Sequence, residues 1–152
     1  LDNVSGWFNK EVAPDWMEDR QKMMSLLQDE AELEEIVQMV GMDALSPADR
    51  LKMEAARSIR EDFLHQNSFH EVDTYTPLRK QYLMMKLVLA FYEKAQEALS
   101  GGASMRALLG MEVRERIGRY KYTTVDQIET EFEKIMNELD AEIAGAFGKE
   151  DF

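Results

Sequence analysis

The sequence predicts an all-α fold, a single helical bundle of about six helices over residues 1–152. Apolar residues recur at spacings of three and four along most of the chain, which is the period of an amphipathic helix. Alternation of apolar and polar residues, which indicates strands, is nearly absent. The 152-residue length, with 45% apolar and 32% charged residues, suits one domain around one core.

Two helices are expected before the first glycine stop. One begins near Pro14, because a proline suits the first turn of a helix. A second, acidic helix is expected over residues 29–40, and Gly41 is a fitting residue to end it. The apolar face of this second helix is predicted to consist of Leu33, Ile36, Val37 and Val40.

The segment "SPAD" predicts the start of a third helix, over residues 47–64. Ser46 is the expected N-cap, Pro47 the first helical residue, and Asp49 occupies the third position of a capping-box variant. Turn-forming residues then interrupt the helical period over residues 65–77.

Three further helices are expected in the C-terminal half. A long one begins at Pro77 and is ended by "SGG" at 100–102, and a less regular one spans residues 104–117. The last begins after Thr124, with Gln127 at the capping-box position. Its apolar stripe is Val125, Ile128, Phe132, Ile135, Leu139, Ile143 and Phe147.

Charge and composition exclude several classes of protein. The net charge of −12 opposes binding to nucleic acid or to anionic lipid. No apolar run approaches the roughly 20 residues of a membrane span, and no signal peptide is visible. The absence of cysteine excludes disulfides and mildly favours a reducing compartment. Because the chain begins at Leu1 rather than Met, we expect it to be part of a longer protein.

Motifs for catalysis or metal binding are also missing. The chain has no phosphate-binding loop, no HExxH pattern and no GxSxG elbow. His65, His70, Glu71 and Asp73 could form a metal site in a loop, but ordinary turn contacts are the simpler interpretation. From these residues alone we predict no catalytic residue and no metal, and an interaction or structural domain.

The order of longer motifs adds a resemblance to a family. "WFNKEVAPDW", then "EEIVQMVGMDALSPADRLKMEAARSIREDFLHQNSFHEVDTYTP" and "YLMMKLVLAFYEKA", closely resemble the C-terminal part of the catalytic A subunit of archaeal (A-type) and vacuolar-type rotary ATPases. The resemblance covers essentially the whole chain. A more distant one is to the F-type beta subunit, whose Gly-Met-Asp turn, acidic loop and "FLSQPF" stretch correspond here to Gly41–Asp43, "ALSPADR" and "FLHQNSF".

This resemblance implies the helical bundle that follows the nucleotide-binding domain of a rotary proton or ion pump. The complete subunit would use ATP or ADP with Mg²⁺, whereas this chain lacks the phosphate loop and is expected to be inactive alone, with no cofactor. The implied partners are the B subunit and the central-stalk subunits, with no nucleic acid and no membrane insertion. The implied location is the cytoplasmic head of the ATPase, peripheral to the membrane.

Two sets of site residues follow from the resemblance. Aromatic residues at the start of the bundle complete the family's adenine pocket, and these correspond to Phe69 and Tyr75, with Gln66 and Asn67 as candidates for contacts to the base edge. The turn after the second helix contacts the rotating stalk in the family. The residues at that turn are Met42, Asp43, Leu45, Ser46, Pro47, Asp49 and Arg50.

The turn is less acidic here than in the F-type relative, since Arg50 offsets one of its two acids. We therefore expect a steric push by a rigid, capped corner, with apolar contact from Met42 and Leu45, rather than a charge-driven one. The alternative function is a self-standing acidic helical adaptor that binds a partner protein through its acidic or methionine-rich face. An in-frame upstream segment with a phosphate loop would favour the ATPase over the adaptor.

Overall fold

The computed structural model describes residues 16–64 and 75–147, and this part of the chain is helical without strands. The α-helices are α2 Trp16–Val40, α3 Pro47–Ser58, α4 Tyr75–Ser100, α5 Met105–Leu109, α6 Val113–Arg119 and α7 Ile128–Ala146. Shorter helical turns are η1 Met42–Ala44, η2 Ile59–Leu64, η4 Tyr120–Tyr122 and η5 Val125–Gln127. The prediction of an all-α bundle with about six helices is confirmed.

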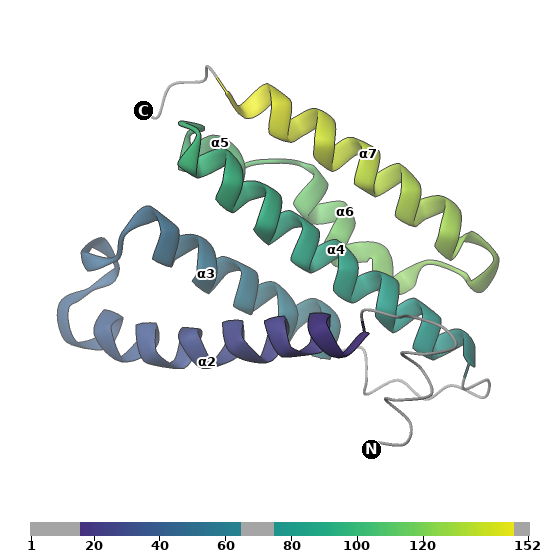
Figure 1. Ribbon diagram of the computed structural model, residues 1–152, viewed down its shortest axis with the longest axis horizontal. Coiled ribbons are helices and arrows are strands. Elements are labelled where there is room, and N and C mark those ends of the chain that lie inside the picture. Colours follow the sequence, from purple (N-terminus) through teal and green to yellow (C-terminus); the bar gives the residue numbers. More distant parts are fainter. Residues whose placement is uncertain (1–15, 65–74, 148–152) are drawn as a thin grey trace.

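The helix α4 lies between two groups of helices (Figure 1). On one side, α2 and α3 form an antiparallel hairpin that packs against it, and on the other side α7 lies along it. The short helices α5 and α6 connect the end of α4 to the start of α7. Because α4 contacts both groups, it is the element that joins them into one bundle.

The sequence of α4 fits this central position. Every residue from Leu83 to Leu89 is buried except Lys86, which is half-buried. A helix that is apolar around its whole circumference needs packing partners on several sides. The hydrophobic core forms around α4, and its largest fully buried side chains from other elements are Leu51, Ile59, Leu108, Val113, Tyr120, Ile135 and Leu139.

The two helices expected before Gly41 are one continuous helix in the structure. The predicted start of a helix at residue 29 is wrong, because Asp29 lies inside α2, where its carboxylate is 3.5 Å from Lys52 Nζ of α3. No glycine or proline occurs between Trp16 and Val40 to end a helix. Two of the acids at the predicted boundary, Asp29 and Glu30, pair with Lys52 of α3 and Arg60 of η2. Pro14, the other predicted start, lies outside the described residues.

The helix predicted over residues 104–117 is also wrong, since α5 ends at Leu109 and α6 begins at Val113. Gly110 follows α5, and a Cβ atom there would lie 3.1 Å from the Arg106 carbonyl oxygen. Arg114 Nη1 donates a 2.9 Å hydrogen bond to the Leu109 carbonyl, so a side chain satisfies one of the orphan acceptors at this helix end.

Two predicted helix ends are confirmed in atomic detail. At "SGG", Gly102 has a φ of 105°, and Ala103 N donates to Ala98 O at 2.9 Å while Gly102 N donates to Leu99 O at 3.1 Å. This pattern is a Schellman motif, which favours glycine in the left-handed position. At α3, the Ser46 hydroxyl accepts a 3.2 Å hydrogen bond from Asp49 N, and Pro47 is the first helical residue.

Other predicted boundaries shift. The helix from Pro47 changes to a π-helical turn at Ile59, and α4 begins at Tyr75, two residues before Pro77. The predicted capping box at Gln127 is wrong, because α7 begins at Ile128 and the Gln127 side chain makes no cap hydrogen bond. Three residues of the predicted α7 stripe (Ile128, Ile135 and Leu139) are buried, Phe132 and Ile143 pack partly against the core, and Val125 and Phe147 at its two ends are exposed.

A buried ion pair joins α2 to α4. Lys86 Nζ lies 2.7 Å from Asp19 Oδ2, and the Asp19 side chain is only 5% exposed. Burial raises the pKa of Asp19 above its ordinary value of 3.8 and lowers the pKa of Lys86, because a charge loses hydration inside the protein. Each group therefore depends on the other to remain charged in this interface.

Replacing Lys86 by methionine is expected to reduce the free energy of unfolding by about 2–3 kcal/mol at pH 7. This loss is smaller than the roughly 3–5 kcal/mol expected when one partner of a fully buried ion pair is removed, because Lys86 keeps some contact with water. The raised pKa means that folded Asp19 takes up a proton as the pH falls toward 3.8, so the loss should shrink at pH 4. Urea unfolding at both pH values measures it.

The control is Lys94→Met, which removes the exposed Lys94–Asp140 pair between α4 and α7 and does not involve Asp19. An exposed pair contributes roughly 0–1 kcal/mol, so this variant should stay close to the parent protein. Equal losses for the two variants would contradict the account of the buried pair.

Removing the N-cap of α3 by Ser46→Ala is expected to cost about 1 kcal/mol of stability, because the Asp49 amide loses its acceptor. Ser25→Ala is the control, since Ser25 is exposed in the interior of α2, where alanine is the better helix former. Thermal unfolding of both variants tests the assignment, and a Ser46 variant as stable as the parent would reject it.

Candidate functional site

The turn between α2 and α3 forms one end of the bundle, at the far left of Figure 1. Gly41 has a φ of 92°, in the region that favours glycine, and so allows the chain to leave α2 sharply. Two hydrogen bonds close the turn, from Ala44 N to Gly41 O at 3.2 Å and from Leu45 N to Met42 O at 3.1 Å. With the Ser46 cap that follows, the turn has a defined backbone.

The predicted stalk-contact residues do not all face outward. The Leu45 side chain is only 7% exposed, so it anchors the turn instead of offering the apolar contact that we expected of it. Met42 is exposed. Of the remaining predicted residues, Asp49 is half-buried, and those with exposed side chains are Asp43, Ser46, Pro47 and Arg50.

Three apolar residues at the end of α2 extend this surface, although they were not among the predicted contacts. Ile36, Met39 and Val40 are exposed, Met39 to 82%. Together with Met42 they form what we call the tip patch. The sequence interpretation placed Ile36 and Val40 on the buried face with Leu33, but α4 runs diagonally away from this end of α2 and leaves them uncovered (Figure 1).

Carboxylates surround the tip patch. Glu32 and Glu35 are exposed one helical turn before Ile36 and Met39, so they lie on the same side of α2. Within the described part of the chain, neither makes an ion pair, whereas Glu30 is held by Arg60 at 2.9 Å on the α3 side. The tip therefore presents apolar side chains beside uncompensated negative charge. The sequence of the turn alone did not predict this combination, because the carboxylates belong to α2.

The predicted adenine contacts cannot be placed in the same way. Gln66, Asn67 and Phe69 lie outside the described residues, as do His65, His70, Glu71 and Asp73 of the possible metal site. Tyr75 is the first residue of α4 instead of part of the preceding loop. The neighbouring ends, Leu64 of η2 and Tyr75, lie at the end of the bundle opposite the tip (Figure 1).

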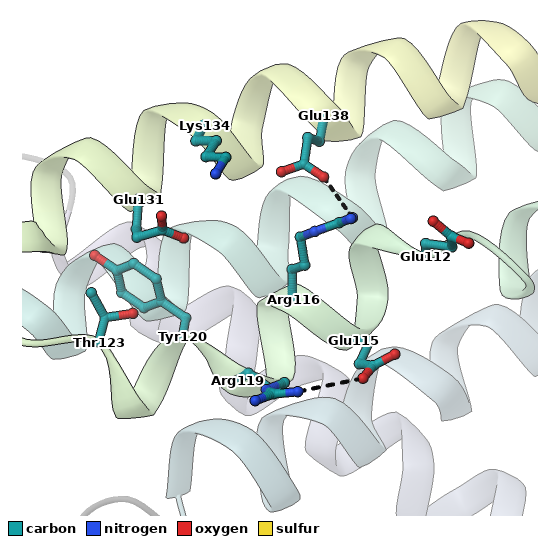
Figure 2. Close-up of a pocket in the computed structure, with 9 residues that line it drawn as sticks. All are labelled: Glu112, Glu115, Arg116, Arg119, Tyr120, Thr123, Glu131, Lys134 and Glu138. Carbon is teal, nitrogen blue, oxygen red and sulfur yellow. Dashed lines mark ion pairs between the residues drawn. The ribbon is translucent and has the colours of Figure 1, made fainter.

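A charged cleft of about 520 Å³ lies between α6 and α7 (Figure 2). Arg116 Nη1 is 2.5 Å from Glu138 Oε2, and Arg119 Nη1 is 3.8 Å from Glu115 Oε1, so opposite charges largely neutralise one another. Tyr120 is buried at its edge, where its hydroxyl donates to the Ile128 carbonyl at 2.6 Å, and burial raises its pKa. Among the nine described residues that line this cleft, none is a nucleophile paired with a base.

Among residues 16–64 and 75–147, no helix is both long and apolar enough to cross a lipid bilayer. The same residues contain no cluster of three or more histidine or carboxylate side chains that could hold a metal ion.

Comparison with known proteins gives a consistent result. A protein family described as the C-terminal domain of V and A type ATP synthase matches residues 5–109. The "V-type ATP synthase alpha chain" of Acetivibrio thermocellus is 53% identical over 150 residues, which cover 99% of this chain and 26% of that protein. The protein of the same name from Clostridium botulinum is 55% identical over 139 residues, which cover 91% of this chain and 23% of that protein.

A third relative, the "V-type ATP synthase alpha chain" of Thermoanaerobacter pseudethanolicus, is 53% identical over 144 residues, covering 91% of this chain and 24% of its own length. The chain thus spans about a quarter of the length of these relatives. The family match extends over most of the chain and agrees with the resemblance in its motifs. The chain belongs to the family of C-terminal domains of V and A type ATP synthases.

Proposed function

We propose that this chain is the C-terminal bundle of the catalytic subunit of a rotary ATP synthase or ATPase, and that it passes the nucleotide state of the subunit to the central stalk. The observation that carries this proposal is the tip patch, which lies on the end of α2 and on the first residue of η1, in a turn whose backbone is fixed by hydrogen bonds. Single exposed apolar residues are ordinary, but a contiguous group of them marks an interaction surface.

The hairpin that carries the tip is built to move as a unit. The helix α2 has 25 residues without interruption, so it is about 37 Å long at a rise of roughly 1.5 Å per residue. The Lys52–Asp29 and Arg60–Glu30 pairs join the middle of α2 to α3 and to the η2 turn that continues it. A displacement at the start of α2 would therefore reach the tip with little loss.

The surroundings of the tip favour a particular partner chemistry. Burying apolar side chains contributes roughly 25 cal/mol per Å² of surface removed from water. This contribution is non-directional, so it favours binding without selecting the orientation of the partner. The unpaired Glu32 and Glu35 beside the patch would add attraction toward lysine or arginine. A helical stalk surface with apolar and basic residues suits both features, so charge has a larger role here than the turn sequence suggested.

The proposal extends to nucleotide binding by the complete subunit. Phe69 and Tyr75 would complete the adenine pocket, with Gln66 and Asn67 at the base edge, while the phosphate loop that binds ATP or ADP with Mg²⁺ would come from the preceding part of the polypeptide. The chain alone would be inactive. In the assembly its neighbours would be the B subunit and the central stalk, in the cytoplasmic head of the enzyme.

The acidic adaptor remains the second candidate, because the tip patch and its carboxylates could equally bind an unrelated basic helix. The coding sequence upstream of this chain distinguishes the adaptor from the rotary subunit. An upstream in-frame phosphate loop supports the rotary subunit, whereas an open reading frame limited to this chain supports the adaptor.

Introducing charge into the tip patch by Ile36→Lys with Met39→Lys is expected to uncouple ATP hydrolysis from ion transport in the assembled enzyme. Both positions are exposed, so the stability of the chain itself should change by no more than about 0.5 kcal/mol. Hydrolysis and ion transport are measured together in reconstituted vesicles, and we expect the ratio of transported ions to hydrolysed ATP to fall.

Met24→Lys is the matched control, because Met24 is exposed on the same helix but lies outside the tip patch. Normal coupling in the tip variant, or an equal loss in the control, would contradict the proposed role of the patch.

Replacing Phe69 by alanine in the complete subunit is expected to weaken nucleotide binding about 5- to 150-fold, which corresponds to roughly 1–3 kcal/mol for one base–aromatic stacking contact. Phe147→Ala serves as a control, because it removes an exposed phenyl ring from the end of α7. Equilibrium titration with a fluorescent ATP analogue measures the effect, and unchanged affinity for the Phe69 variant would reject the stacking contact.

A further inference from the structure

A second group of exposed apolar side chains lies at the corner between α6 and α7. Tyr122 is 71% exposed and Val125 is 63% exposed, and we call these two residues the corner patch. They belong to η4 and η5, the short turns that reverse the chain before α7. Corners of this kind are usually polar, so two large apolar side chains facing water need an explanation.

The corner is held in place by side chains from the first turns of α4. Lys80 Nζ donates to the carbonyl oxygens of Lys121 and Thr123, at 2.5 and 2.8 Å. One residue earlier, Arg79 binds both carboxylate oxygens of Glu129 at 2.8 and 3.1 Å. The two Lys80 bonds hold the backbone on either side of Tyr122, and the Arg79–Glu129 pair joins the start of α4 to the first turn of α7.

The Tyr122 ring is also held from within the corner. Lys121 Nζ lies 5.6 Å from the ring centre, close enough for a cation–π contact. The same Nζ is 3.4 Å from the Glu61 carbonyl oxygen of η2. The exposed apolar surface is therefore preorganised, which lowers the entropy that a partner must remove on binding.

The position of the corner patch indicates which partner it meets. Contacts to Arg79, Lys80 and Glu61 place it beside the start of α4 and the turn η2. The helix α2 begins at this same end of the bundle, opposite the tip (Figure 1). The family is a C-terminal domain and the chain spans about a quarter of its relatives, so the preceding polypeptide of such a subunit joins through the start of α2.

We infer that the corner patch docks against an apolar surface of the preceding domain in the same subunit. The inference rests on the proposed function, because it requires the chain to be the C-terminal part of a longer catalytic subunit. It adds a direct protein–protein contact between the two domains, separate from the proposed adenine pocket. The bundle then has an apolar contact at each end, the corner patch toward the preceding domain and the tip patch toward the stalk.

The test compares the 152-residue chain with the full-length subunit by hydrogen–deuterium exchange. The amides of residues 121–127 should exchange at least tenfold more slowly in the subunit than in the chain. Tyr122→Lys with Val125→Lys should abolish that difference and lower the midpoint of thermal unfolding of the subunit. The same substitutions should lower the unfolding midpoint of the chain much less than that of the subunit, because both side chains are exposed in the chain and lose there only the exposed Lys121–Tyr122 contact.

Met39→Lys is the control, since Met39 is more exposed than either corner residue but lies at the opposite end. It should leave exchange at 121–127 unchanged in the subunit. Equal exchange in the chain and the subunit would overturn the inference, as would protection that arises only when other subunits are added. Destabilisation of the chain as large as that of the subunit would overturn it too, because the patch would then be covered within the chain.

These outcomes are separate from those of the proposed function. Coupling is measured with the tip variant, so a full-length subunit with normal corner protection and no effect of the tip variant would reject the stalk contact alone. A subunit that couples through the tip but shows no corner protection would reject this inference alone.

Discussion

The burial of α4 on both of its long sides is the constraint on which the rest of the structure depends. Its segment from Leu83 to Leu89 packs against the α2–α3 hairpin on one side and toward α7 on the other. Neither group of helices could cover its own apolar face without this shared partner. The one charged residue in the segment, Lys86, is accommodated because Asp19 of α2 lies 2.7 Å from its Nζ atom.

The diagonal course of α4 also determines which surfaces stay uncovered. Where it leaves α2, the last turns of that helix expose Ile36, Met39 and Val40, and where it begins, its Lys80 and Arg79 side chains hold the corner that exposes Tyr122 and Val125. Both exposed groups are thus consequences of one packing arrangement. A stiff body with apolar contacts at opposite ends is suited to transmit displacement, which is the function that we propose for it.

The fold was largely predictable because local signals agree with the packing. The Ser46 cap, the "SGG" stop and the helical period act within a few residues, and the structure confirms all three. The continuity of α2 and the break at Gly110 depend on contacts with other elements, so the sequence alone misplaced those boundaries. The tip patch was missed for the same reason. Ile36 lies three residues after Leu33 on the same face of α2, and only the path of α4 determines that Leu33 is buried and Ile36 is exposed.

Native-state hydrogen exchange of this chain tests the central claim most directly, because it measures whether the bundle is one cooperative unit. If α4 joins both groups, the most protected amides of α2, α4 and α7 should open with the same free energy, equal to that of global unfolding. If the α2–α3 hairpin instead opens at clearly lower free energy while α4 and α7 stay protected, the hairpin is not firmly joined to the bundle. It could not then transmit displacement to the tip as a stiff element.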